Sequence, residues 1–127
     1  MNARPYLLED YPTLATWWEA HEWPAIPIDF LPALGIVIEG HAAGFLYNDP
    51  TSAGIMLEFV VTHPLNTPRE SAKAIKLLIS TAESIARDMG RTSIFTTCKQ
   101  QSFSRLLQSS GFIETDKSMI HLIKPIT

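Results

Sequence analysis

The residue best placed for chemistry is a glutamate in the most apolar part of the chain. Glu58 lies within residues 55–62, whose alternating apolar side chains predict a strand. A carboxylate in such a strand is a candidate general base, because burial raises its pKa towards the range in which it accepts a proton. A half-exposed glutamate that pairs across the sheet explains the same pattern. Glu58 is therefore a candidate base, with a purely structural role as the alternative.

A helix N-terminus follows this strand and offers a site for an anion. Thr67, Pro68, Arg69 and Glu70 form a capping box with proline at the first helical position. Free N–H groups and the positive end of the helix dipole attract phosphate there. Pro68 removes one donor and an unpaired Glu70 would repel phosphate, whereas Thr67 and Arg69 add contacts. An ordinary capping box on a packing helix is the alternative, and the sequence leaves both open.

Two aromatic side chains, the histidines and one cysteine complete the candidates. His21 and Trp23 would either line a binding pocket or pack their loop onto the core. The 4 histidines lie in different predicted elements without ligand spacing, so the sequence predicts no metal site. The single cysteine, Cys98, excludes an intramolecular disulfide and favours a reducing compartment.

Composition restricts the class of protein. The chain of 127 residues is 46% hydrophobic and 18% charged, which predicts one globular domain over residues 1–127. A net charge of −3 excludes a strongly basic nucleic-acid binder. The sequence contains neither the apolar run of a membrane span nor that of a signal peptide. We expect a soluble cytoplasmic protein without nucleic-acid or membrane partners.

The N-terminal half is predicted to form strands around one helix. Asp10 caps this helix, whose stripe at helical spacing consists of Leu14, Trp17, Trp18 and His21. A short strand at residues 6–8 precedes the helix, and a proline-rich loop follows it at residues 22–34. Residues 35–39 and 42–47 then form two strands that a tight turn connects.

The C-terminal half alternates strands and helices. The strand at residues 55–62 is predicted to place on one face Ile55, Leu57, Phe59 and Val61. The helix opened by the capping box ends at Gly90, and its apolar face consists of Ile75, Leu78, Ile79, Ala82, Ile85, Ala86 and Met89. Residues 92–98 form a strand parallel to residues 55–62, since a helix connects the two. Ser102 caps a short helix, and residues 112–123 form a last, antiparallel strand.

This order predicts an α+β fold, and three of its segments resemble the GNAT superfamily of N-acetyltransferases. E-F-V-V-T-H-P at residues 58–64 resembles the family's central strand and the turn after it, and residues 65–74 resemble its pyrophosphate-binding junction. L-L-Q-S-S-G-F at residues 106–112 is similar to its late helix and Gly-Phe pair. Ala72 stands in place of a glycine of the phosphate loop, and Leu107 stands in place of a tyrosine that often protonates the departing thiolate.

The resemblance implies a GNAT-like mixed, mostly antiparallel sheet with helices on both faces and one parallel strand pair at the cofactor cleft. It implies acetyl-CoA as co-substrate, no metal, and direct attack by an amine of a small molecule or peptide. Glu58 would be the base, and His21 and Trp23 would line the acceptor pocket. The implied cofactor-binding residues are Phe59, Val60, Val61, Thr62, Thr67, Arg69, Glu70, Ser71, Ala72, Lys73, Ala74 and Ser102.

Two other functions fit the same sequence. The altered phosphate junction also fits a catalytically inactive GNAT-like fold that acts as a binding or interaction module, with residues 17–32 as its surface. Small side chains along the cleft, such as Thr96 and Thr97, fit an enzyme that uses a larger acyl-CoA. Members of the family often form dimers, so a homodimer stays open as well. Binding of CoA would distinguish the enzyme from the inactive module.

Overall fold

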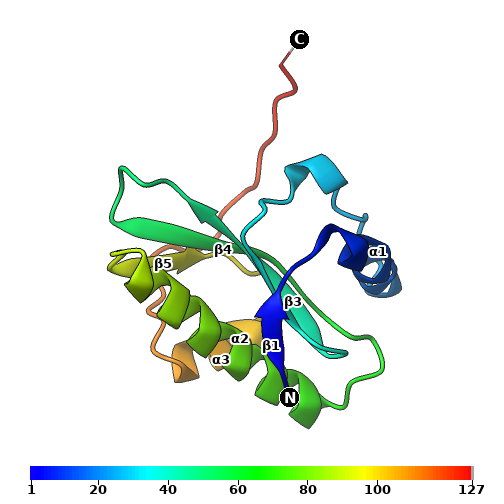
Figure 1. Ribbon diagram of the computed structural model, residues 1–127. Helices are drawn as coiled ribbons and strands as arrows, with labels where there is room; N and C mark the ends of the chain where they lie inside the picture. The colour runs from blue at the N-terminus through cyan, green and yellow to red at the C-terminus, as the bar shows by residue number, and fades with distance from the viewer. Residues whose placement is uncertain (127) are drawn as a thin grey trace.

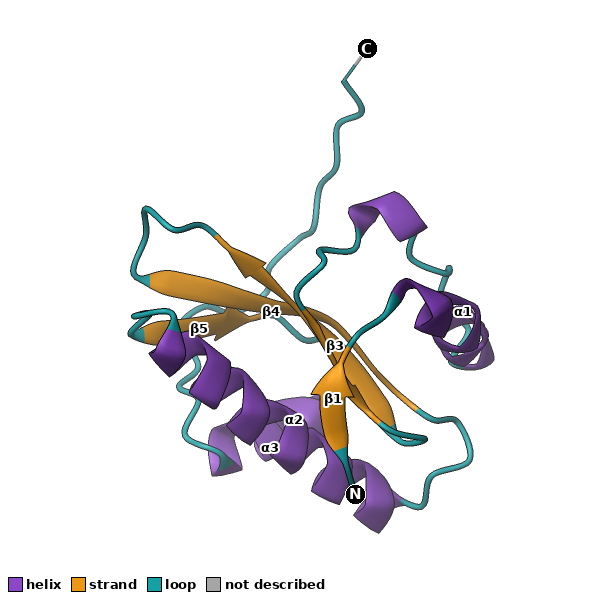
Figure 2. Cartoon of the chain, viewed as in Figure 1, coloured by secondary structure: helices purple, strands orange, loops and turns teal. Residues whose placement is uncertain are grey.

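The computed structural model describes residues 1–126 and contains a five-stranded sheet packed between helices (Figure 1). One face of the sheet carries α1, and the other face carries α2 and α3 (Figure 2). The elements are β1 (Ala3–Pro5), α1 (Tyr11–Ala20), β2 (Gly35–Ile38), β3 (Ala42–Asn48), β4 (Gly54–Thr62), α2 (Pro68–Asp88), β5 (Ser93–Thr96) and α3 (Gln101–Ser109), with short 3-10 turns at Leu8–Asp10 and Ile28–Phe30.

The sheet has the mixed topology that the sequence predicts. Its strands lie in chain order, with antiparallel neighbours from β1 to β4 and a parallel pair formed by β4 and β5. The last pair is parallel because α2 carries the chain back to the same end of the sheet. The α+β class, the helices on both faces and the parallel pair are therefore confirmed.

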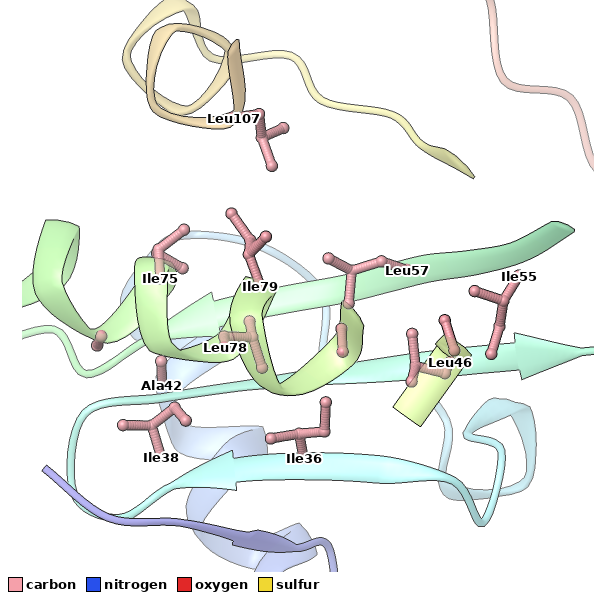
Figure 3. Close-up of a cluster of buried hydrophobic side chains, with 13 residues drawn as sticks. Ile36, Ile38, Ala42, Leu46, Ile55, Leu57, Ile75, Leu78, Ile79 and Leu107 are labelled. Carbon is pink, nitrogen blue, oxygen red and sulfur yellow. The ribbon is translucent and has the colours of Figure 1, made fainter. Parts of the chain in front are cut away.

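The apolar face of α2 forms the larger of two cores. Leu78 is fully buried and belongs to one cluster with Ile36 of β2 and Leu57 of β4 (Figure 3). Thr67 caps the start of the helix with its side chain, and Gly90 adopts a φ of 74° just beyond the end. The capping residues determine where the helix begins and ends, so the predicted helix and both of its ends are confirmed.

The second core lies on the opposite face, under α1. Both adjacent tryptophans of this helix are buried, with Trp17 exposed by 5% and Trp18 by 1%. They pack in one cluster with Phe45 of β3 and Val61 of β4. These two tryptophans are therefore core residues. They are not part of an interaction surface of the kind considered for residues 17–32.

The start of the chain differs from the prediction. β1 occupies Ala3–Pro5, whereas residues 6–8 lead into a 3-10 turn. Asp10 lies at the N-cap position of α1, as predicted, but its side chain makes no capping hydrogen bond, because the carboxylate accepts hydrogen bonds of 2.7 and 2.9 Å from the Arg4 guanidinium and one of 2.8 Å from the Leu7 N–H. The hydrogen bond from Arg4 lowers the pKa of Asp10. This network ties β1 to the beginning of α1.

The end of the chain differs more. α3 begins at Gln101, so Ser102 lies within the first turn of the helix and does not cap it. The predicted strand at residues 112–123 is wrong, because the described chain runs on after α3 without strand structure. A strand needs a neighbour for its backbone groups, and none of the described segments pairs with this one.

Replacing Leu78 tests how far the fold depends on the contact between α2 and the sheet. We expect Leu78→Ala to lower the free energy of unfolding by about 2–5 kcal/mol, because it opens a cavity at a fully buried site. Leu65 precedes α2 and is 85% exposed, so Leu65→Ala should change that free energy by less than about 0.5 kcal/mol. Urea titration measures both variants, and equal losses would contradict the packing described above.

Candidate functional site

A bulge in β4 sets the geometry of the candidate site. Phe45 pairs with Glu58 and Ala43 pairs with Val61, so Gly44 alone faces two residues of β4. Phe59 adopts a φ of 57°, which is unusual for a residue with a large side chain. The extra residue breaks the alternation of the strand. The prediction of one common face for Ile55, Leu57, Phe59 and Val61 is therefore wrong: the first two face α2, and the last two face α1.

The two parallel strands separate next to this bulge. The pairing of β4 with β5 ends at Leu57 and Thr96, where the Thr96 hydroxyl donates a 2.8 Å hydrogen bond to the Leu57 carbonyl. β4 continues to Thr62 without β5 beside it. The second half of β4 thus pairs with β3 on one side, and its other side faces open space. A bound molecule can reach backbone groups along that side.

A cavity of about 570 Å³ lies beside the free half of β4, among the start of α2, α3 and the segment after α1. It reaches from the α2 and α3 side of the sheet to the loop that follows α1. The residues that line it are His21, Trp23, Val60, Val61, Thr62, Pro68, Ser71, Ala72, Ile75, Gln100, Ser102, Phe103, Arg105 and Leu106. A long, flexible ligand can therefore contact the free side of β4, the start of α2 and the segment after α1 at once.

His21 is fixed at the end of β4. Its Nε2 lies 2.9 Å from the Thr62 carbonyl oxygen, and because a carbonyl only accepts, Nε2 carries the proton. The ring of Trp23 stacks on the imidazole at a centroid distance of 5.0 Å. Nδ1 of a neutral His21 is then the nitrogen that can accept a proton from a ligand.

The N-terminus of α2 has few free donors. The Glu70 N–H donates to the Thr67 hydroxyl over 3.1 Å, and the Glu70 carboxylate accepts from the Thr67 N–H over 2.8 Å. This backbone hydrogen bond lowers the pKa of Glu70, so its negative charge stays at the helix end. Pro68 has no N–H. Within the described chain, the Arg69 N–H is the donor of this first turn that pairs with no protein group.

Eight of the residues predicted to bind cofactor or acceptor line the cavity. They are His21, Trp23, Val60, Val61, Thr62, Ser71, Ala72 and Ser102. Six others do not line it: Phe59, Thr67, Arg69, Glu70, Lys73 and Ala74. Ala74 is fully buried in the core, and the Phe59 ring packs edge-on against Tyr47. The structure thus gathers the first set around the cavity, whereas Thr67, Arg69 and Glu70 lie next to its wall at Pro68 and Ser71 without lining it.

At α3 and just before it, the sequence analysis assigned Ser102 to the site and missed four further residues. Gln100, Phe103, Arg105 and Leu106 all line the cavity, and Arg105 is the only lysine or arginine among the described lining residues. Phe103 and Leu106 are partly buried and pack against the core under α2. Arg105 is exposed, and neither a motif nor helical spacing marks it, so its place on the cavity wall follows from the tertiary fold.

Glu58 lies beside the cavity without lining it. It is the direct cross-strand partner of Phe45, and so it lies on the face that α1 covers in part. Burial raises the pKa of Glu58, and the nearby His121 opposes this shift. Burial also raises the pKa of Tyr47, with a further contribution from the charge of Glu58. Glu58 is thus a half-buried carboxyl with aromatic neighbours, next to the point where the strands separate.

Comparison with known proteins identifies the fold. No model of a known family matches the sequence, and the curated proteins contain no match. Among solved structures, yncA from Salmonella typhimurium with its cofactor acetyl-CoA has 15% identity and a TM-score of 0.68, over 91% of this chain and 80% of that one. A Trypanosoma brucei acetyltransferase has 17% identity and a TM-score of 0.67, over 96% and 99%. The ribosomal-protein-alanine N-acetyltransferase of Brucella melitensis has 18% identity and a TM-score of 0.61, over 98% and 99%.

These likenesses establish the fold, and at that level they confirm the resemblance to GNAT acetyltransferases. Identities of this size carry no conclusion about the reaction or its substrates. Within residues 1–126, each helix is too short or too polar to cross a bilayer. In the same region, no three side chains among His, Cys, Asp and Glu come together as a metal site requires.

Replacing Glu58 tests whether the ionised form of this side chain destabilises the folded protein. A raised pKa means that the folded protein binds this proton more tightly than the unfolded chain, so ionisation above that pKa costs stability. We expect Glu58→Gln to raise the thermal midpoint at pH 7, and the gain to disappear as the pH falls below about 4.3, the usual glutamate pKa. Thermal melts from pH 3 to pH 8 measure this. A loss of stability at pH 7 would instead identify a carboxylate that is favourably paired across the sheet.

Proposed function

We propose that this protein is an acetyl-CoA-dependent N-acyltransferase. It transfers the acetyl group to an amine of a small molecule or a peptide by direct attack, without a covalent enzyme intermediate. The observation that carries the proposal is the cavity along the half of β4 that β5 leaves unpaired, which continues to the start of α2. A cytoplasmic location is part of the same proposal.

Three features of the cavity support acetyl-CoA as the donor. The free side of β4 at Val60, Val61 and Thr62 offers backbone groups to the amides of the pantetheine arm. The Arg69 N–H and the positive end of α2 suit the pyrophosphate, and Ser71 and Ala72 line the cavity beside them. Arg105 adds a cation on the opposite wall.

The reaction needs a proton acceptor and a proton donor. The amine nitrogen forms a bond to the thioester carbon, the C–S bond breaks, and the amine proton must leave while the thiolate gains one. Glu58 or Nδ1 of His21 accepts the amine proton, and a backbone N–H of β4 stabilises the negative charge on the carbonyl oxygen. Ser102 lines the cavity, and its hydroxyl can pass a proton from a water molecule to the thiolate, taking the water's proton as it gives up its own. Leu107, at the position of the family's tyrosine, is 3% exposed and packs in the core.

Thermal denaturation with acetyl-CoA is the direct test. At a hundredfold excess over the dissociation constant, binding should add about 2.7 kcal/mol to the free energy of unfolding, which raises the midpoint by several degrees. Arg105→Glu should reduce this rise, because it reverses the charge on the cavity wall. Arg87→Glu, near the other end of α2, should leave it unchanged and serves as the matched control. Release of free thiol with a panel of amines then measures transfer.

Two results would contradict the proposal. The absence of any shift at millimolar acetyl-CoA would remove the donor and leave an inactive GNAT-like binding module. A shift with acetyl-CoA but no amine-dependent thiol release would leave a CoA-binding protein without transferase activity. A larger rise of the thermal midpoint with longer acyl-CoA thioesters would instead identify a larger acyl-CoA as the donor. This is the alternative that the small side chains of Thr96 and Thr97 suggest.

Removing the charge of Glu70 should improve binding of acetyl-CoA. Its carboxylate lies at the helix end that would receive the pyrophosphate, so the two negative charges repel each other. We expect Glu70→Gln to tighten acetyl-CoA binding by about twofold to fivefold at low salt, the size of helix-terminus charge effects. Isothermal titration measures it.

Glu83→Gln is the control for this experiment, because Glu83 lies on the same helix but away from its N-terminus. It should leave the affinity for acetyl-CoA unchanged. Weaker binding by Glu70→Gln would show that the capping box is needed to shape the phosphate site, and it would contradict the electrostatic argument.

A further inference from the structure

One end of the sheet face that carries α1 is uncovered. Phe45 lies in the core under α1, so Tyr47, two residues further along β3, lies on the same face. Met56 of β4 pairs with Tyr47, and Phe95 of β5 pairs with Met56, so three strands contribute to one row. The helix α1 lies over the other end of this face (Figure 2). We call Tyr47, Met56 and Phe95 the apolar shelf, and their side chains are exposed by 39%, 41% and 58%.

Neighbouring residues hold the two aromatic rings of the apolar shelf in place. The Tyr47 hydroxyl donates a hydrogen bond to the Phe30 carbonyl, which fixes this ring against the loop that follows α1. The Phe95 ring packs directly on Gly54, since a Cβ at Gly54 would overlap with the ring. Both rings are therefore restrained before a ligand arrives, and a ligand that binds there loses little affinity to the ordering of the protein.

Glu58 lies at the inner end of the apolar shelf. It follows Met56 by two positions on β4, so its side chain points to the same face, about 7 Å further along the strand. The carboxylate is half-buried, and no group within residues 1–126 donates a hydrogen bond to it or forms an ion pair with it. The rings of Tyr47 and Phe59 meet edge-on beside it, with their centroids 6.1 Å apart. An unpaired carboxylate beside aromatic rings is suited to a cation, which both the charge and the ring faces attract.

We propose that the acceptor is a small primary amine with an apolar body such as an aromatic ring, bound with its nitrogen at Glu58 and its body on the apolar shelf. This assignment rests on the proposed function and names the substrate class of that site. A primary amine is an ammonium ion at neutral pH, so it supplies the positive charge that the carboxylate lacks. Glu58 is two positions from Val60, which lines the donor cavity, so one strand holds both the amine and the donor.

The apolar shelf narrows the choice of amine further than the charge of Glu58 does. A small polar amine pairs with the carboxylate but leaves Met56 and Phe95 in water, so it gains nothing from the shelf. A diamine would place its second charge on apolar side chains, which costs desolvation. His21 and Trp23 lie beyond the bulge, where His21 contacts the Thr62 carbonyl at the far end of β4. The body of the acceptor is thus assigned to the shelf, and His21 and Trp23 to the cavity that they line.

Titration of the protein with phenethylamine, without acetyl-CoA, tests the amine site separately from the enzymatic activity. Isotope-labelled methionine methyl groups report binding by NMR, because a bound phenyl ring shifts the Met56 resonance, whereas that of Met89 at the end of α2 should not move. Met56→Leu assigns the resonance. Ethanolamine carries the same aminoethyl group without the ring, and phenethyl alcohol carries the ring without the amine. We expect each of them to bind about threefold or more weakly than phenethylamine.

Two variants and one control test the contacts, with the resonances of the ligand as the readout. Glu58→Gln removes the charge and should weaken binding of phenethylamine by about threefold to tenfold, while that of phenethyl alcohol stays unchanged. Met56→Gln should weaken binding of phenethylamine by about threefold, because it replaces apolar contact by a polar side chain. Met89→Gln makes the same change at a methionine of similar exposure, 38%, and should have no effect. Circular dichroism establishes that the variants remain folded.

Three results would overturn this assignment: no shift of the Met56 methyl at millimolar phenethylamine, equal affinity for ethanolamine, or equal losses of affinity in Met56→Gln and Met89→Gln. Binding of the amine by a protein that does not bind acetyl-CoA would support the amine site and contradict the proposed function alone. Where acetyl-CoA does bind, kcat/KM for thiol release should be higher with phenethylamine than with ethanolamine and should fall in Met56→Gln. A preference for ethanolamine would again overturn the assignment.

Discussion

The bulge at Phe59 is the constraint on which the rest of the site depends. Gly44 lies opposite the bulge, and a Cβ there would lie 3.1 Å from both the Leu57 and the Leu78 side chains, so a larger residue would force these neighbours to shift. The bulge bends β4 and turns its side chains, so that one strand contributes Leu57 to the core under α2 and Val61 to the core under α1. The same bend ends the pairing with β5 and so leaves the space that a ligand needs.

The position of α2 follows from the loop that connects it to β4. Asn66 donates from its side-chain nitrogen to the His41 carbonyl over 2.9 Å and to the Ser71 hydroxyl over 3.2 Å. His41 belongs to the turn between β2 and β3, so this amide fixes the start of α2 against the rest of the sheet. The helix end therefore points into the cavity because of a tertiary contact, and not only because of its own capping box.

Local signals explain what the sequence predicts correctly. The capping box at Thr67, the glycine at position 90 and the apolar repeat between them act within a few residues, so they define α2 without reference to the rest of the fold. The bulge could not be predicted, because nothing in the local sequence favours a positive φ at a phenylalanine, and the register shift involves a glycine in another strand. The error at residues 112–123 has the same origin: their apolar pattern indicates a strand, but a strand forms only where a partner edge is within reach.

The start of α2 shows how stability and function compete for the same groups. A capping box stabilises a helix by pairing its first N–H groups with its own side chains, whereas an anion site keeps those groups free. Here Thr67 and Glu70 use two donors and Pro68 supplies none, so the Arg69 N–H is left at the helix end. A phosphate in this position depends correspondingly more on side chains from elsewhere. Arg105 of α3 is the lysine or arginine that lines the cavity in the described chain, so under the proposed function we expect an anionic ligand to depend on the last helix as well as on the start of α2.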